Sequence, residues 1–193
     1  MKLKLLCAAL LSLGLTSGLL AQLPPRGAEF VITKIDRNLI TAPQFSYTGA
    51  EQYTTNQRDR WLEVEVEFTA VPEYTDELTF KYYILVGGKL LTGEVTHVSI
   101  AAGRDDRSVM YVSPRTLARI MGNRPVVPNS IQNIAVQIVQ QGAVKAESSL
   151  ERGSGAQWFA SMPQIAGLVL NKNETPFAPL YWGRYEQIKA PTR

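Results

Sequence analysis

Two alternating apolar segments flank Gly87-Gly88, and this arrangement constrains the fold more than any other feature of the chain. Two glycines between such segments are typical of the tight two-residue turn of an antiparallel β-hairpin. With the glycines as the loop, residues 78–86 pair with residues 89–100, and Tyr82 lies opposite Gly93. A shift by one residue would move every apolar side chain to the other face. The expected cross-strand pairs are Val86 with Lys89, Ile84 with Leu91, Phe80 with Val95, Leu78 with His97, Lys81 with Glu94, and Thr79 with Thr96.

Alternation elsewhere predicts further short strands and one helix. Ser113-Pro114 is typical of a helix N-cap followed by proline at the first helical position, and Gly122 supplies the stop. About seven or eight strands with one short Ser113-capped helix indicate an all-β protein. An immunoglobulin-like β-sandwich is the expected architecture, and a small β-barrel is the alternative. The other strands are expected at 29–35, 61–68, 107–112, 131–140, 143–150 and 165–170.

The first 21 residues have a basic start and an apolar run that stops at Ala21-Gln22, shortly before Pro24-Pro25, as in a secretory signal peptide. Cleavage is expected after Ala21, with Gly18 as the alternative site, and an uncleaved anchor is a further alternative. The apolar run is shorter than the roughly 20 residues that span a bilayer. Residues 22–193 then form a single domain that is exported, to be periplasmic, secreted or on the cell surface. It is not expected to be an integral membrane protein.

Removal of this leader changes the chemistry available to the chain. The only cysteine, Cys7, lies in the leader, so neither a disulfide nor a thiolate metal site is expected in the mature domain. The formal charge of +3 falls to +1 because Lys2 and Lys4 are lost and no acid goes with them. A nearly neutral chain does not favour nucleic acid as a partner.

Few residues point to catalysis, and no catalytic residue, metal or cofactor is predicted. His97 is the only histidine, and a half-buried, hydrogen-bonded side chain is favoured over a catalytic base. Ser113 is favoured as the helix cap rather than as a nucleophile. Asp105-Asp106 is expected in a solvated turn, with a calcium ion as the alternative. Asn173 begins a pattern typical of N-glycosylation acceptors, which matters only in a eukaryote.

Three glutamates, Glu63, Glu65 and Glu67, alternate with apolar residues in the predicted strand 61–68. Residues two apart in a strand share a face and lie about 7 Å from each other. A solvated strand face is the favoured interpretation. Calcium binding or acid–base catalysis by this row is the alternative.

Six aromatic residues lie within a stretch of 28 residues near the C-terminus. Such rings suit both a hydrophobic core and a recognition surface, and core packing is favoured. If Leu180 began a strand, Tyr181 and Tyr185 would share one face and Trp182 the other, so at least one ring would be exposed. The candidate binding residues are Trp158, Phe177, Tyr181, Trp182 and Tyr185, and Phe159 completes the six.

The leader, the opening EFVITKI and the closing NKNETPFAPLYWGRYEQIK resemble small exported immunoglobulin-like proteins associated with bacterial pilus machinery. The resemblance implies a pilus-associated or cell-surface structural role without catalysis. It does not extend to type IV pilin subunits, whose long apolar N-terminal helix would be broken here at Pro24-Pro25. A non-enzymatic protein that works through contact with a protein partner or as a homo-oligomer is therefore expected. The alternatives are a carbohydrate-binding module that uses the exposed aromatics and a hydrolase that uses His97 or the glutamate row.

Overall fold

The computed structural model of the chain describes most of the predicted domain. The leader, Cys7 and both cleavage sites lie outside the described residues and stay predictions. Within the described part of the chain, no helix is long and apolar enough to cross a membrane. The described residues are 27–46, 48–49, 59–122, 124–151, 155 and 157–190.

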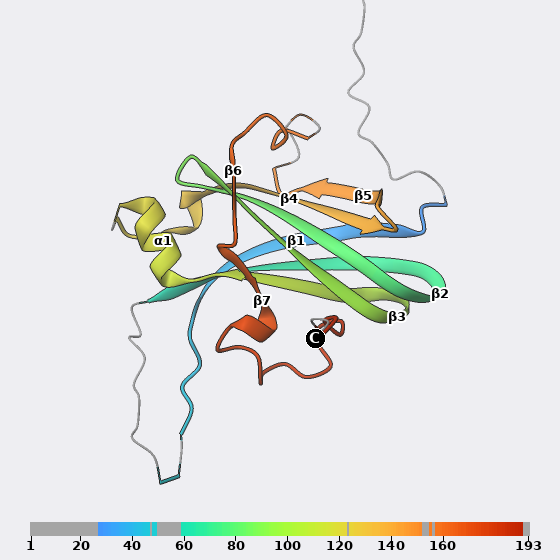
Figure 1. Cartoon of the computed structure of the whole chain (residues 1–193), viewed down its shortest axis with the longest axis horizontal. Coiled ribbons are helices and arrows are strands. Elements are labelled where there is room, and N and C mark those ends of the chain that lie inside the picture. The colour runs from blue at the N-terminus through green and yellow to red at the C-terminus, as the bar shows by residue number, and fades with distance from the viewer. Residues whose placement is uncertain are drawn as a thin grey trace, which may run out of the picture.

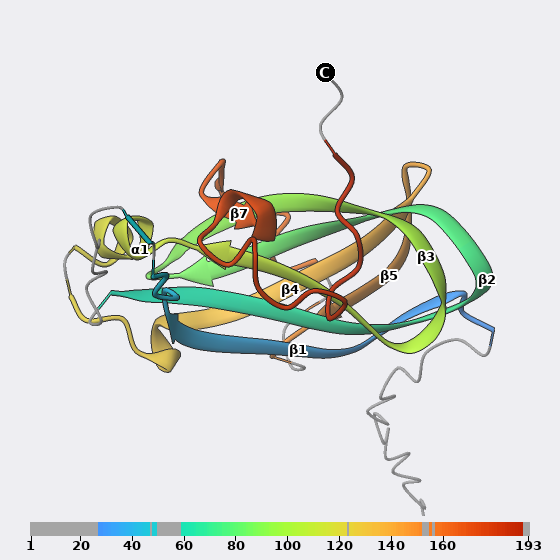
Figure 2. The same cartoon turned by 90° about the horizontal axis from the view of Figure 1, so that it is seen from below.

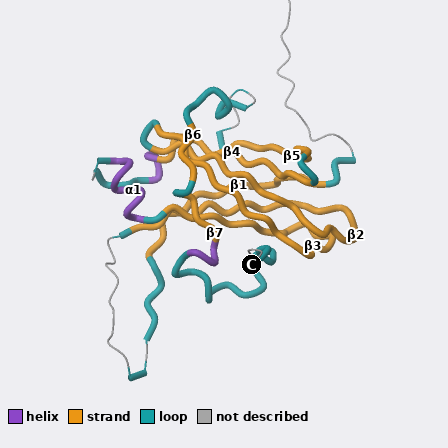
Figure 3. Tube along the Cα trace, viewed as in Figure 1, coloured by secondary structure: helices purple, strands orange, loops and turns teal. Residues whose placement is uncertain are grey.

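Strands dominate the described residues, as the sequence predicts (Figure 1, Figure 3). The all-β prediction is confirmed, and the strands do not close into a barrel. The elements are β1 (Phe30–Thr41), β2 (Arg60–Val86), β3 (Lys89–Val112), α1 (Pro114–Met121), the 3-10 turn η1 (Pro128–Ser130), β4 (Ile131–Gln140), β5 (Ala143–Ser149), β6 (Gln164–Ala166), β7 (Val169–Asn171) and the 3-10 turn η2 (Lys172–Glu174).

The predicted hairpin is present, and it is much longer than the sequence pattern indicates. All the pairs expected around Gly87-Gly88 occur in the register of β2 with β3, including Tyr82 with Gly93. The two strands run to 27 and 24 residues, with register irregularities between Phe68 and Tyr74. Asp105-Asp106, expected in a solvated turn, lies within β3 instead. The expected strands 61–68 and 107–112 are thus parts of one long bent hairpin.

The hairpin contributes its two halves to two packed layers. The first layer contains β1, residues 60–70 of β2, residues 103–112 of β3 and β7. The second layer has the order β5-β4-β2-β3-β6, with β6 parallel to β3 and the other pairs antiparallel. The layers meet through their inner faces, which confirms the β-sandwich. The predicted hairpin of β4 with β5 is confirmed, whereas the strand expected at 165–170 is divided by Gly167 into β6 and β7.

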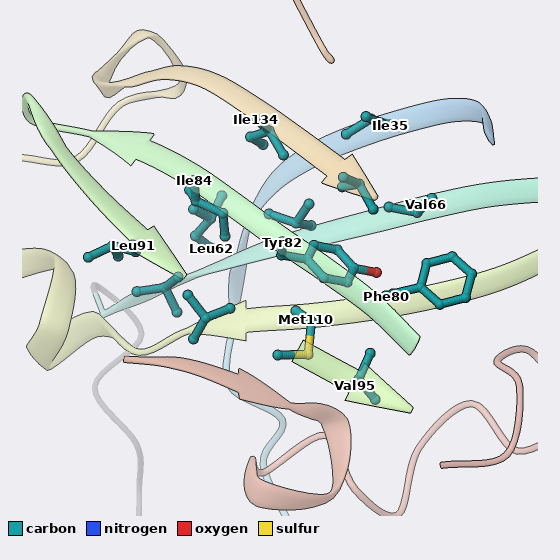
Figure 4. Close-up of a cluster of buried hydrophobic side chains, with 14 of the residues drawn as sticks. Ile35, Leu62, Val66, Phe80, Tyr82, Ile84, Leu91, Val95, Met110 and Ile134 are labelled. Carbon is teal, nitrogen blue, oxygen red and sulfur yellow. The ribbon is translucent and has the colours of Figure 1, made fainter. Parts of the chain in front are cut away.

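One hydrophobic core fills the space between the layers (Figure 4). The rings of Phe68 and Phe80, from opposite layers, lie 4.8 Å apart. The hydroxyl of Tyr82 in the second layer donates a hydrogen bond to Ser108 Oγ in the first, at 2.7 Å. Both residues are fully buried, so this bond satisfies polar atoms that would otherwise be costly inside the core.

Helix α1 has the predicted caps. Ser113 Oγ accepts a hydrogen bond from the backbone N–H of Thr116 at 3.2 Å, and Gly122 adopts the left-handed conformation that ends the helix. Leu117 is fully buried, which shows that the amphipathic stripe packs on the sandwich. Met121 lies against Gly87, so the helix covers the end of the hairpin.

Gly93 permits close contact between the layers. A Cβ atom at this position would lie 2.6 Å from Val169 Cβ, which cannot move without shifting β7. We expect Gly93→Ala to lower the free energy of unfolding by about 1–3 kcal/mol, because overpacking strains the core. Gly155→Ala is the control, since Gly155 has open space around it and ordinary backbone angles; it should change stability by less than about 0.5 kcal/mol. Urea unfolding measures both, and equal stability of the two variants would refute the role of Gly93.

The C-terminal segment and its aromatic surface

Residues 172–190, called the C-terminal segment below, cross the first layer on the face away from the core (Figure 2). Part of the segment also pairs with the free edge of β3, where His97 and Ile188 form an isolated antiparallel bridge. Because the segment both covers a face and pairs with an edge, it is an integral part of the sandwich. Its backbone bonds to β3 are Glu186 N–H to Arg107 O at 3.0 Å, Val98 N–H to Gln187 O at 2.9 Å, and Lys189 N–H to Thr96 O at 2.8 Å.

The glutamate row lies beneath this segment, so the prediction of a solvated strand face is wrong. Glu63 and Glu65 are buried, and Glu67 is partly buried. Alternation correctly placed the three on one face of β2. It gave no sign that a segment more than 100 residues later covers that face.

Glu65 is the point at which the segment is fixed. The guanidinium of Arg184 donates to both of its carboxylate oxygens at 2.9 Å, and the Tyr185 hydroxyl donates to it at 2.7 Å. Only 6% of the Glu65 side chain is exposed. A two-pronged Arg–carboxylate contact combines charge with fixed geometry, and burial makes its loss expensive. These three residues form what we call the Glu65 clamp.

The neighbouring acids also have partners. Oxygens of Asp36, Glu65 and Glu67 lie within 4.8 Å of one another, a spacing that could suit a metal ion. Lys34 pairs with Asp36 at 2.6 Å, and Arg107 pairs with Glu67 at 3.0 Å. With Arg184 on Glu65, each carboxylate has a cation beside it. The arrangement is therefore an ion-pair network that neutralises its own charge.

His97 connects the C-terminal segment to the core. Its Nε2 lies 2.8 Å from Ser108 Oγ and its Nδ1 lies 3.0 Å from the backbone oxygen of Glu186. The hydrogen-bonded histidine is confirmed, although it is fully buried rather than half-buried. Burial lowers the pKa of His97 to about 4. A histidine beside a serine is typical of nucleophilic catalysis, but both side chains here lie inside the core, where they join the layers.

Two of the candidate aromatics pack beneath the segment. Phe177 is buried and stacks on Tyr111 with 4.7 Å between ring centres, and Trp61 meets its edge at 5.7 Å. Tyr185 is partly buried, and burial raises the pKa of its hydroxyl, the group that binds Glu65. Both rings therefore contribute to the attachment of the segment rather than to an open surface.

Trp158 lies on the other side of the molecule. Phe159 stacks on Tyr83 of the second layer with 3.9 Å between ring centres, and Trp158 meets Phe159 edge-on at 5.7 Å. The indole N–H of Trp158 donates to Ser149 Oγ at 3.1 Å. The structure therefore does not bring Trp158 together with the other candidate binding residues.

Tyr181 and Trp182 are the exposed candidates, at 49% and 88% of their surfaces. They lie in a turn, closed by the Arg184 N–H to Tyr181 O bond of 3.2 Å, and not in a strand. Tyr181 has a left-handed φ of 58°, an unusual conformation for a residue with a side chain. The Glu65 clamp begins two residues after Trp182, so an apolar side chain is held outward on an anchored turn.

A hollow of about 610 Å³ lies beside this turn. Tyr181, Trp182 and Lys172 line it. Lys172 is largely buried, its Nζ donates to the backbone oxygen of Ala178 at 2.7 Å, and the same atom lies 5.9 Å from the centre of the Trp182 ring. Sequence reasoning missed Lys172, because no local pattern predicts a tertiary contact between a 3-10 turn and a tryptophan ten residues later.

These features define an all-β sandwich protein whose C-terminal segment closes one face and carries an exposed aromatic turn. A protein-family model matches residues 24–192, nearly the whole chain, and the chain belongs to that family. The crystal structure of a protein from Akkermansia muciniphila is similar, with 24% sequence identity and a TM-score of 0.74. The alignment covers 85% of this chain and 94% of that one, and the likeness shows a shared fold. No curated protein matches the sequence.

The Glu65 clamp should make a large contribution to stability. We expect Glu65→Gln to lower the free energy of unfolding by about 2–4 kcal/mol, since the amide leaves the Arg184 cation without its buried counter-charge. Glu73→Gln, an exposed glutamate of the same strand, should change stability by less than about 0.5 kcal/mol. Urea unfolding compares the two, and a Glu65→Gln cost as small as that of Glu73→Gln would show that the clamp is not stabilising.

Buried His97 should make the fold sensitive to acid. Its folded pKa of about 4 lies below the unfolded value near 6.5, so the unfolded state takes up a proton first and stability falls from pH 6.5 to pH 4. The loss reaches about 3 kcal/mol at most. Burial raises the pKa of the Asp106 and Glu186 carboxyls, which acts in the opposite direction on acidification.

The difference between wild type and His97→Gln isolates the histidine, because the carboxyls contribute to both proteins. Urea unfolding at pH 6.5, 5 and 4 should show wild type losing about 2–3 kcal/mol more than the variant. Parallel pH profiles for the two proteins would contradict the assignment.

Proposed function

We propose that this chain is an exported, non-catalytic structural protein of the bacterial cell surface, associated with pilus machinery, that works through protein–protein contacts. The observation that carries the proposal is the 88% exposure of Trp182 on an anchored turn. Tryptophan is enriched among residues that dominate protein interfaces. An anchored backbone turn loses little conformational freedom on binding, which favours affinity.

The state of the ionisable groups supports a non-catalytic role. His97 and Ser108 are enclosed by the core, and Glu65 is saturated by Arg184 and Tyr185. A general base must reach the substrate proton, either directly or through one water. The hydrolase alternative has the least support, because His97, Glu63 and Glu65 are buried and Glu67 is partly buried and paired with Arg107.

The first 21 residues and the sequence resemblance support the location. The leader has the layout of a secretory signal peptide, and the resemblance is to exported proteins encoded with pilus machinery. Family membership over residues 24–192 is compatible with a domain that begins directly after such a leader.

A carbohydrate-binding module is the second candidate, favoured by a specific observation. Tyr181 and Trp182 are adjacent, exposed and next to a hollow, whereas Phe177 and Phe159 are buried. Exposed aromatic faces beside polar groups suit the apolar faces of sugar rings.

Site-directed photo-crosslinking in the native bacterium tests the protein-contact proposal. With p-benzoylphenylalanine in place of Trp182, we expect one discrete adduct, either with a second protein or with another copy of this chain. The same group in place of Val127, which is 51% exposed in a different loop, is the matched control and should give no such adduct.

The purified adduct partner, identified by mass spectrometry, should bind the wild-type protein in solution. Trp182→Ala should weaken this binding by about 30-fold, the effect of an interface residue that contributes about 2 kcal/mol. No adduct at 182, or the same adducts at 182 and 127, would refute a specific contact through this turn.

A further inference from the structure

Lys172 is a largely buried cation that no described carboxylate neutralises. Its residue surface is only 8% exposed, and among the described residues its Nζ donates a hydrogen bond to the uncharged backbone oxygen of Ala178. The described ion pairs do not include it, although they include Arg107 and Arg184 at the glutamate row. An ammonium has three donors, and a buried charge without a counter-ion is costly.

The ammonium lies where a ligand could reach it. Ala178, whose backbone oxygen accepts from Nζ, and Trp182, whose ring centre lies 5.9 Å from Nζ, both line the hollow, as Lys172 itself does. Trp182 adds an aromatic surface that is almost entirely open to solvent. A carboxylate in the hollow would therefore meet a cation and an indole ring together.

The remaining lining residues indicate what else the ligand carries. Glu186, Asn173 and Gln187 border the same hollow and supply acceptors and donors suited to hydroxyl groups. Glu186 would repel a ligand with several carboxylates, but it can accept hydrogen bonds from hydroxyls. The combination matches one carboxylate on a ring with several hydroxyls better than it matches an acidic peptide.

We propose that this hollow binds an acidic sugar, with the sugar carboxylate on Lys172 Nζ and the ring against Trp182. The proposal rests on the carbohydrate-binding candidate above and names its ligand class; it does not depend on the protein contacts. Lys172 then has the role of selecting acidic over neutral sugars, and Trp182 the role of binding both.

Saturation-transfer NMR titration of the purified protein with D-glucuronate and D-glucose tests this, since the two sugars differ mainly at the carboxylate. We expect glucuronate to bind with a dissociation constant on the order of 1 mM, and glucose at least about tenfold more weakly. Lys172→Met, which keeps a similar apolar stem, should abolish this preference. Trp182→Ala should remove binding of both sugars, and Trp158→Ala should change neither.

Thermal unfolding of each variant first shows that it is folded. Equal binding of the two sugars, or a preference that survives Lys172→Met, overturns the assignment of Lys172 and leaves carbohydrate binding intact. Absence of binding by either sugar to the wild type at 50-fold the expected constant, about 50 mM, overturns the site and the carbohydrate candidate together. Selective binding of an acetylated Asp-Glu peptide, added as a third arm, with no sugar binding, would assign the hollow to a protein partner instead.

Discussion

The arrangement of the C-terminal segment depends on one buried carboxylate. Glu65 faces away from the core in the middle of the first layer, and a charge removed from water there requires partners. Arg184 and Tyr185 supply them, so the segment that carries them must cross this face. The exposed turn at Trp182, the hollow beside it and the contact of His97 with the Glu186 backbone all lie within a few residues of that anchor.

The long hairpin explains why a single segment can both seal a face and pair with an edge. Because β2 and β3 bend between the layers, the outer edge of β3 runs continuously from the second layer into the first. β6 pairs with its first residues and β7 with its last, while the bridge at Ile188 lies between them. Pairing along this edge leaves few free backbone groups for unspecific strand addition, the usual liability of open sheets. This edge is thus closed by strands of the same chain, and the proposed contact at Trp182 is made by a side chain.

Local rules predicted the parts of the fold that local energetics determine. The register around Gly87-Gly88 and the Ser113 cap follow from turn geometry and side-chain bonding between near neighbours, and both were correct. The glutamate row was misjudged because period-2 alternation distinguishes the two faces of a strand but not what covers them. The same limit applies to the burial of the six aromatic residues near the C-terminus. Their burial depends on which layer of the sandwich each ring contacts. Of the six, Tyr181 and Trp182 are exposed, because they lie in a left-handed turn that their residue types do not favour.

The turn at Tyr181 and Trp182 has an unfavourable backbone conformation, so other contacts must stabilise it. The left-handed backbone of Tyr181 destabilises the folded chain by on the order of 1 kcal/mol. The exposed indole of Trp182 does not offset this, because it gains no burial on folding. The Glu65 clamp and Gly183, which accepts a positive φ without strain, hold the turn in place. The backbone turn that carries Trp182 is anchored by the ion pair of Arg184 with buried Glu65, so this part of the proposed surface is ordered in the folded chain. The conformational entropy of the turn is thus lost when the chain folds. Binding at this surface then has a smaller entropy cost.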